Sequence, residues 1–156
     1  MTLYQQVPVE KAFAGPHSLQ ERLGKKLDAR TIASIDPQVL EDVFREKPAL
    51  HRFPANMAKR TQAVANFIVD EYDGDPEAIW DGVESGAELL KRIKKMPGFG
   101  DYKARVYAAV LAQQFGIKPE GWDDKLPEWP NISEVHSEAD RADMKERKKA
   151  WKAAQK

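Results

Sequence analysis

The feature that most constrains the fold of this chain is a tight turn at residues 97–100, Pro-Gly-Phe-Gly, between two predicted helices. In the helix before the turn, Leu89, Leu90 and Ile93 form one apolar face, and four basic residues surround its end. The helix after the turn begins near Asp101. Its predicted buried stripe is formed by Ala104, Tyr107, Ala108, Leu111 and Phe115. Gly116 is its predicted C-cap.

Two glycines flank one large apolar residue in this turn. We expect Phe99 to point into the core, while the backbone around Gly98 and Gly100 stays bare beside the free N–H groups of a helix start. A helix N-terminus with exposed N–H groups attracts anions. The turn is therefore a candidate seat for a phosphate group.

The run MPGFGDYKA resembles the LPGVGxxTA hairpin of the helix-hairpin-helix DNA glycosylases, the endonuclease III-like (HhH-GPD) family. In that family a catalytic aspartate follows, after a short loop, the Phe-Gly pair that closes the second helix. Here Asp123 has the matching spacing from Phe115, although the second helix is two residues longer. The resemblance covers about residues 3–126. It implies an all-α, HhH-GPD glycosylase-like domain over residues 1–132, shortened at its start, and a polar, basic C-terminal helix or tail over residues 133–156.

This resemblance implies a monofunctional DNA N-glycosylase of base excision repair. Its partner would be double-stranded DNA with a damaged or mispaired base, and Asp123, or Asp124 if the register differs by one, would hydrolyse the N-glycosidic bond. A carboxylate suits this reaction because it stabilises the positive charge that develops on the sugar. Taken alone, an aspartate in such a loop more often caps a helix or is solvated. A non-catalytic helix-hairpin-helix DNA-binding module and a helical protein-interaction domain stay open as alternatives.

Tyr102 occupies the position where strand-nicking members of the family carry a lysine nucleophile. Lys103 comes one residue later, and one helical residue rotates a side chain by about 100°, so its amine is expected to point away from the pocket. Base removal without lyase activity is the expected outcome. Tyr102 and Trp122 are candidates for the base pocket, although simple packing explains an aromatic residue at either position equally well.

Further DNA contacts are predicted from a short motif and from charge. The segment at residues 4–7, Tyr-Gln-Gln-Val, resembles the LQQT or SAQA segment that these glycosylases insert into the duplex. The net charge of the chain is zero, but residues 86–118 contain seven basic and two acidic side chains. This excess indicates phosphate contacts near the turn, whereas a lysine run alone usually marks a solvated face. The predicted DNA-binding residues are Gly98, Phe99, Gly100, Lys94, Lys95, Lys103, Gln5 and Gln6.

Composition limits the cofactors and the location that we expect. The chain has no cysteine, which excludes disulfides and the iron–sulfur cluster that many relatives carry. Its histidines, His17, His51 and His136, lie far apart in sequence, so no catalytic metal is expected. The resemblance leaves room for an alkali cation held by hairpin carbonyls. No apolar run reaches the length of a membrane span, and a monomeric, cytoplasmic, nucleoid-associated protein is expected.

The rest of the chain is predicted to form short helices. Asp36 followed by Pro37 is a strong helix-start signal. The helix after it is expected to bury Val39, Leu40, Val43 and Phe44. A turn is expected at Gly15-Pro16, with Ser18 capping the helix after it. The first predicted helical range is 1–14, in which Pro8 either breaks the helix near its middle or starts a second helix. The other predicted ranges are 18–23, 28–35, 37–46, 55–72, 76–82 and a surface helix within 133–156.

Overall fold

In the computed structural model, which describes residues 1–155, the chain is all-α, as predicted. The described part contains seven α-helices, three short 3-10 helices and no strand. It divides into two compact units. Unit 1 comprises Met1–Ile79 with Met96–Gly98, and unit 2 comprises Trp80–Lys95 with the chain from Phe99 onward. Within residues 1–155, no helix is both long enough and apolar enough to cross a bilayer.

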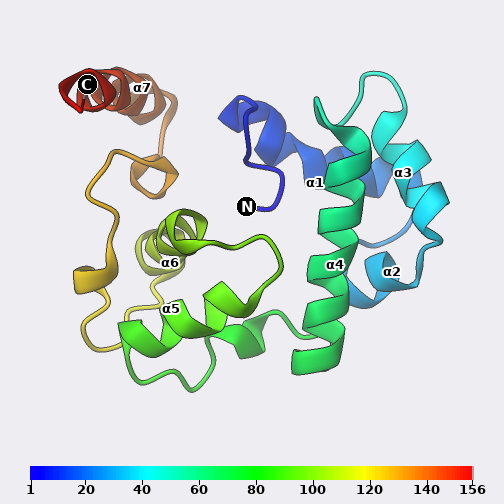
Figure 1. Cartoon of the computed structure of the whole chain (residues 1–156), viewed down its shortest axis with the longest axis horizontal. Coiled ribbons are helices and arrows are strands. Elements are labelled where there is room, and N and C mark those ends of the chain that lie inside the picture. Colours follow the sequence, from blue (N-terminus) through cyan, green and yellow to red (C-terminus); the bar gives the residue numbers. More distant parts are fainter. Residues whose placement is uncertain (156) are drawn as a thin grey trace. The chain divides into compact units, whose positions relative to one another are not determined.

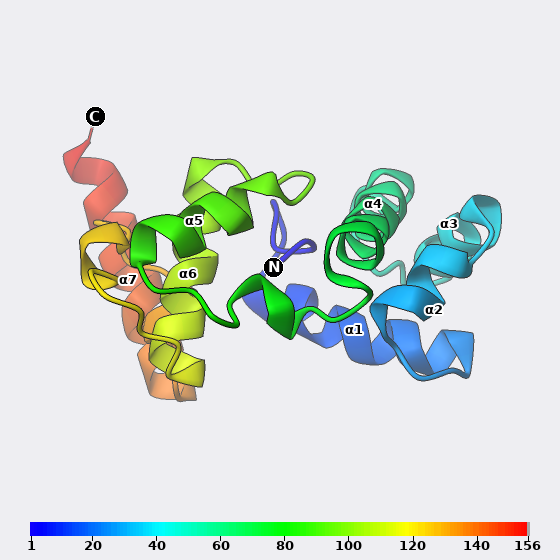
Figure 2. The same ribbon diagram turned by 90° about the horizontal axis from the view of Figure 1, so that it is seen from below.

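Unit 1 is organised around α4 (Pro54–Tyr72). Both α2 (Ala29–Ser34) and α3 (Pro37–Arg45) pack along α4 (Figure 1, Figure 2), and α1 (Val9–Leu23) contacts α3. A short 3-10 helix, η1 (Glu77–Ile79), lies where the longer helix over residues 76–82 was expected. The core of unit 1 is made by Leu3, Ala12, Leu19, Leu40, Phe44, Leu50, Met57 and Ala58.

Two helix starts in unit 1 follow directly from local sequence signals. The side chain of Asp36 accepts hydrogen bonds from the N–H groups of Gln38 and Val39, and Pro37 is the first helical residue, as predicted. At α2, the Asp28 carboxylate accepts a 2.7 Å hydrogen bond from the Thr31 N–H, which lowers the pKa of Asp28. Each cap satisfies N–H groups that have no partner inside the helix.

The turn predicted at Gly15-Pro16 and the Ser18 cap are wrong, and the helix predicted over residues 1–14 is confirmed only after Pro8, from Val9 onward. Pro8 precedes a single helix, α1, which continues through Pro16 to Leu23. The buried side of α1 is formed by Ala12, Gly15 and Leu19, which share one helical face. A Cβ on Gly15 would overlap the side chain of Leu3. Packing of this face therefore overrides the local preference of a Gly-Pro pair for a turn.

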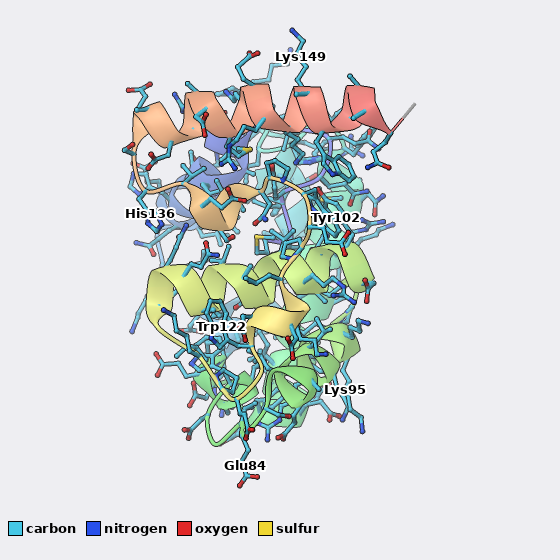
Figure 3. The ribbon with its side chains drawn as sticks, turned by 90° about the vertical axis from the view of Figure 1, so that its left-hand side faces the viewer. Glu84, Lys95, Tyr102, Trp122, His136 and Lys149 are labelled. Atoms are coloured by element: carbon cyan, nitrogen blue, oxygen red, sulfur yellow. The ribbon has the colours of Figure 1, made fainter. Side chains whose placement is uncertain are left out.

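Unit 2 is organised around α6 (Asp101–Phe115). α5 (Gly86–Lys95) lies on one side of α6, and η3 (Ile132–Glu134) with α7 (Glu138–Ala154) lies on the other (Figure 1, Figure 3). The C-terminal helix or tail expected over residues 133–156 thus contains α7. η3 contacts both α6 and α7 and so links the two helices. A third short helix, η2 (Asp123–Lys125), packs against α5 and α6.

Most residues of the predicted apolar helix faces are buried, but two residues predicted to be buried, Val39 and Phe115, are exposed. Leu89, Leu90 and Ile93 are all buried in α5. Val39 is 51% exposed because α3 buries the narrower Leu40–Phe44 stripe, and Val39 is turned about 100° from it. Phe115 is 68% exposed. Phe115 lies in the last turn of α6, and residues 114–116 are exposed. The apolar stripe of α6 is therefore longer than the part of the helix that is packed.

Candidate nucleic-acid interface

The turn between α5 and α6 has the backbone geometry expected of a phosphate seat. Gly98 has a φ of 77°, and Gly100 is the N-cap of α6 with φ −67° and ψ 175°. Apart from each glycine and its two chain neighbours, no atom lies within 4 Å of the Cβ position of either glycine. No side chain caps the N-terminus of α6. Phe99 is 5% exposed, as predicted, and its ring centroid lies 5.8 Å from that of Tyr107.

An acidic side chain, Asp101, follows this turn directly and pairs with two of the basic residues around it. The Asp101 carboxylate pairs with Lys94 and, at 2.8 Å, with the Nε of Arg105. Hydrogen bonds from Lys94 and Arg105 hold the pKa of Asp101 below its ordinary value. Lys94 was expected to contact phosphate, but here it neutralises a carboxylate. The i, i+4 spacing of Asp101 and Arg105 was a signal for part of this pairing.

The two other predicted lysines remain close to the turn. Lys95 is exposed at the last position of α5. The Nζ of Lys103 lies 5.3 Å from the ring centroid of Phe99, within the range of a cation–π contact. The amine of Lys103 is therefore close to the ring of Phe99 in the turn.

The loop that carries Asp123 is attached to the opposite end of α5. The Gly86 N–H donates a 2.8 Å hydrogen bond to the Glu120 carbonyl, and the Glu120 N–H donates one of 3.1 Å to the Glu84 carbonyl. A Cβ on Gly86 would lie 2.7 Å from both the Gly121 oxygen and the Trp122 Cα. The absence of a side chain at Gly86 is what lets the loop approach so closely. We call this contact the Gly86 clamp.

Asp123 and Asp124 both lie in η2 and both are exposed. Within residues 1–155, neither carboxylate has a hydrogen-bond or ion-pair partner. The clamp and the packing of η2 against α5 and α6 fix the backbone beneath them. The two carboxylates are therefore presented to solvent from a firmly held loop.

The two aromatic residues expected in one base pocket lie in different surroundings. The ring of Tyr102 stacks on that of Trp129, with centroids 4.7 Å apart and an interplanar angle of 7°. Trp122 lies beside the Gly86 clamp, with the Nζ of Lys118 5.2 Å from its ring centroid. Figure 3 shows Tyr102 and Trp122 toward opposite ends of α6. The structure does not bring these two rings into contact in the described part of the chain.

The predicted insertion segment is a supported loop in unit 1. Gln6 is exposed and has a φ of 54°, a strained conformation for a residue with a side chain. The Gln5 carbonyl lies 2.9 Å from the Nε2 of His51, and its side-chain oxygen accepts a hydrogen bond from Arg60. Gln5 is thus held in place, and Gln6 is the residue presented outward.

His51 is the buried support of this loop, a role that its isolated position in the sequence does not indicate. It is 1% exposed, and its Nδ1 accepts a 3.1 Å hydrogen bond from the Phe53 N–H. The Nε2–H must then be the donor to Gln5, which makes the ring neutral. Burial lowers the pKa of His51, and Lys11 and Arg52 lower it slightly further, against the opposing hydrogen bond to Gln5.

No group of three or more histidine, aspartate or glutamate side chains is placed to hold a metal ion within residues 1–155. Comparison of the chain with family models, with curated proteins and with solved structures finds no match in any of the three. The assignment of a function therefore depends on the turn, the Asp123 loop and the surfaces around them.

Proposed function

We propose that this chain is a monofunctional DNA N-glycosylase of the helix-hairpin-helix type. The observation that carries the proposal is the turn at residues 97–100. The space around the Cβ positions of Gly98 and Gly100 is empty to 4 Å beyond their chain neighbours. The N-terminus of α6, which follows this turn, has no side-chain cap. Backbone N–H groups in such a place bind a phosphate of the duplex without reading its sequence.

Charge around the turn supports a phosphate as the ligand. Lys95 and Lys103 supply positive charge next to the open N–H groups. The helix dipole of α6 adds a partial positive charge at the same end. Asp101 opposes these contributions, so we infer a moderate affinity that suits a protein scanning along DNA.

In this proposal Asp123 is the catalytic carboxylate. As the N-glycosidic bond breaks, the base leaves with the bonding electrons and takes up a proton, while positive charge develops on the sugar. The oxygen of a water molecule then bonds to the sugar carbon, and its proton passes to the carboxylate. An ionised Asp123 stabilises the sugar charge and orients that water. The Gly86 clamp holds the loop so that this carboxylate keeps its position.

The residue at the lysine position of strand-nicking enzymes supports base removal alone. Tyr102 cannot form a Schiff base, and Lys103 is directed at Phe99. Borohydride treatment should therefore trap no covalent adduct with damaged DNA.

One observation favours a non-catalytic DNA-binding module as the second candidate. The Asp123 carboxylate is exposed and has no group orienting it within residues 1–155, whereas catalytic groups are usually held by neighbours. In this alternative the turn binds duplex and no base is released.

The experiment that separates the two is a panel of duplexes containing uracil, alkylated purines, oxidised guanine or an A:G mispair, scored for binding and for abasic sites. Binding with base release from at least one duplex supports the glycosylase. Salt-sensitive binding without any release supports the non-catalytic module. Absence of duplex binding at low salt overturns both and leaves a helical protein-interaction domain.

A further inference from the structure

A groove in unit 1 lies between one face of α1 and the segment that follows α3. Its volume is about 310 Å³, at the lower end of the range of small-molecule sites. The groove is lined by Lys11, Ala14, Gly15, Ser18, Arg22, Pro48, Ala49 and Leu50. The lining residues of α1 follow helical spacing, so they form one stripe along the helix.

The two positive charges of this groove lie toward its opposite ends. Arg22 comes eleven residues after Lys11, which separates their backbones by about 16 Å along the axis of α1. The other wall runs in the reverse direction: Arg22 donates a 2.8 Å hydrogen bond to the Pro48 carbonyl, and Lys11 is near His51. The pKa of His51, lowered mainly by its burial, is lowered further by the charge of Lys11. Apolar residues line the groove between these ends.

Arg22 is held firmly in place and keeps its charge. Its Nη1 donates hydrogen bonds of 2.9 Å and 3.0 Å to the carbonyls of Val43 and Glu46, in addition to the Nη2 bond to Pro48. A guanidinium has five N–H groups and stays protonated, so these bonds leave the Nε–H and one Nη2–H unused. Within residues 1–155, Arg22 forms no ion pair. It is therefore a positioned group for an anion at this end of the groove.

The acidic residues nearest in sequence to these two cations do not line the groove. They are Glu10, Glu21 and Glu46. A carboxylate oxygen of Glu21 lies 3.5 Å from the Nε2 of His17 on a neighbouring face of α1. The lining therefore combines two cations with an apolar floor and contains no negative side chain.

We propose that this groove binds an elongated small molecule with an apolar middle and a carboxylate at each end. One carboxylate accepts hydrogen bonds from Arg22, because a carboxylate matches the geometry of guanidinium N–H groups, and the other pairs with Lys11. A neutral ligand would leave both cations without a counter-charge, and a wholly polar one would leave the apolar floor uncovered.

The size of the groove also selects this class of ligand. A cavity of about 150 Å³ holds benzene, so about 310 Å³ has room for about a dozen non-hydrogen atoms. A folded protein partner would need an interface of more than about 1,000 Å². The site lies within unit 1 and requires neither that the turn bind duplex nor that Asp123 be catalytic.

The test is an NMR titration of the ¹⁵N-labelled full chain at low salt with nonanedioate, with nonanoate and with 1,9-nonanediol. Nonanedioate should shift the amide signals of residues 11–22 and 48–50. It should bind about threefold or more tightly than nonanoate, because the second carboxylate adds an exposed ion pair with Lys11. The uncharged diol should bind more weakly than either. Lys11→Gln should make the affinities for nonanedioate and nonanoate equal, whereas Lys25→Gln, an exposed lysine outside the groove, should leave their ratio unchanged.

A steric variant tests the location independently of charge. Ala14→Leu places a larger side chain in the groove and should weaken binding of both carboxylates about tenfold or more, while leucine preserves the helix. The inference is overturned if the parent shows no saturable shift with nonanedioate up to about 10 mM. It is also overturned if a folded Ala14→Leu variant binds as the parent does, or if the parent binds nonanedioate and nonanoate equally. Duplex binding should be the same in the parent and in Ala14→Leu, which keeps this test separate from the function proposed for the turn.

Discussion

At the first residue of α5, Gly86 lies so close to the Asp123 loop that a Cβ would sit 2.7 Å from the Gly121 oxygen. In the turn that follows α5, Gly98 and Gly100 have no atom other than those of their chain neighbours within 4 Å of their Cβ positions. All three glycines lack a side chain, but only at Gly86 does the chain itself occupy the space. The comparison separates a glycine needed for packing from glycines that leave a surface open.

Gly100 is the clearest example of a glycine that the fold itself does not require. Gly98 has a φ of 77°, which by itself favours glycine. The φ of −67° and ψ of 175° at Gly100 suit any residue, and serine or aspartate would cap α6 as well or better. Since neither backbone strain nor packing calls for glycine at this position, the approach of a ligand to the backbone is the physical reason that we infer.

The largest effect is expected from the carboxylate that the Gly86 clamp holds. Asp123→Asn should slow base release by about a hundred- to a thousandfold, because an uncharged amide no longer stabilises the sugar cation. Affinity for damaged duplex should be unchanged or slightly higher. Single-turnover assays and anisotropy titrations measure the two quantities. Asp124→Asn is the matched control and should be much milder; the reverse order would move the catalytic role to Asp124, and full activity in both variants would end the Asp123 mechanism.

The packing side of the comparison predicts that Gly86→Ala destabilises the protein by about 1–3 kcal/mol, because the added Cβ meets backbone atoms that cannot move aside easily. Chemical denaturation followed by circular dichroism gives this free energy. Gly100→Ala is the control and should cost less than about 1 kcal/mol, the loss expected at an N-cap. Equal losses in the two variants would show that both glycines serve the fold.

His51 is a second position that is closely packed by the protein itself, and its burial makes the stability of the fold depend on pH. Burial lowers its pKa below the ordinary value, so the unfolded chain binds this proton more readily than the folded chain. Stability should therefore fall as the pH drops from 7.5 to 5.5, as protonation removes the acceptor of the Phe53 N–H. Thermal melts should show a weaker pH dependence in His51→Gln. An identical dependence in both proteins would assign it to other groups.

The smallest expected effect concerns Asp101, the acidic residue in the open turn. Asp101→Asn removes a negative charge and releases Lys94 and Arg105, so duplex affinity should rise by a few-fold and its salt dependence should steepen. Anisotropy titrations at several salt concentrations measure both. Glu41→Gln, which breaks a comparable i, i+4 pair with Arg45 in unit 1, should leave affinity unchanged. A weaker affinity in Asp101→Asn would mean that this residue supports the turn more than it opposes DNA.

The elements that the sequence predicts well are those with local causes. The Asp36-Pro37 start of α3, the buried face of α5 and the Gly116 cap of α6 each depend on residues within one or two turns. Phe99, the large apolar residue of the turn, is likewise buried as predicted. Local backbone preference and hydrophobic spacing agree at all of these positions.

The structural features that the sequence does not predict depend on contacts between residues that are far apart in the chain. The path of α1 through Pro16 is decided by Leu3 packing on Gly15, and the support of Gln5 comes from His51, 46 residues away. Trp129 meets Tyr102 across 27 positions. No spacing rule links such residues, because their proximity arises only when separate helices pack. The candidate site was therefore predictable as a set of segments but not as a set of contacts.

The central claim is that the open side of Gly100 exists for a phosphate, and duplex affinity of Gly100→Ala tests it most directly. The account predicts a loss of about tenfold or more, since charge-assisted hydrogen bonds to the backbone are blocked, with helical content nearly unchanged. Gly86→Ala, measured under conditions where it is folded, should keep its duplex affinity while losing stability. Parent-like binding by a folded Gly100→Ala variant would contradict the account, because the turn would then not be where this protein contacts DNA.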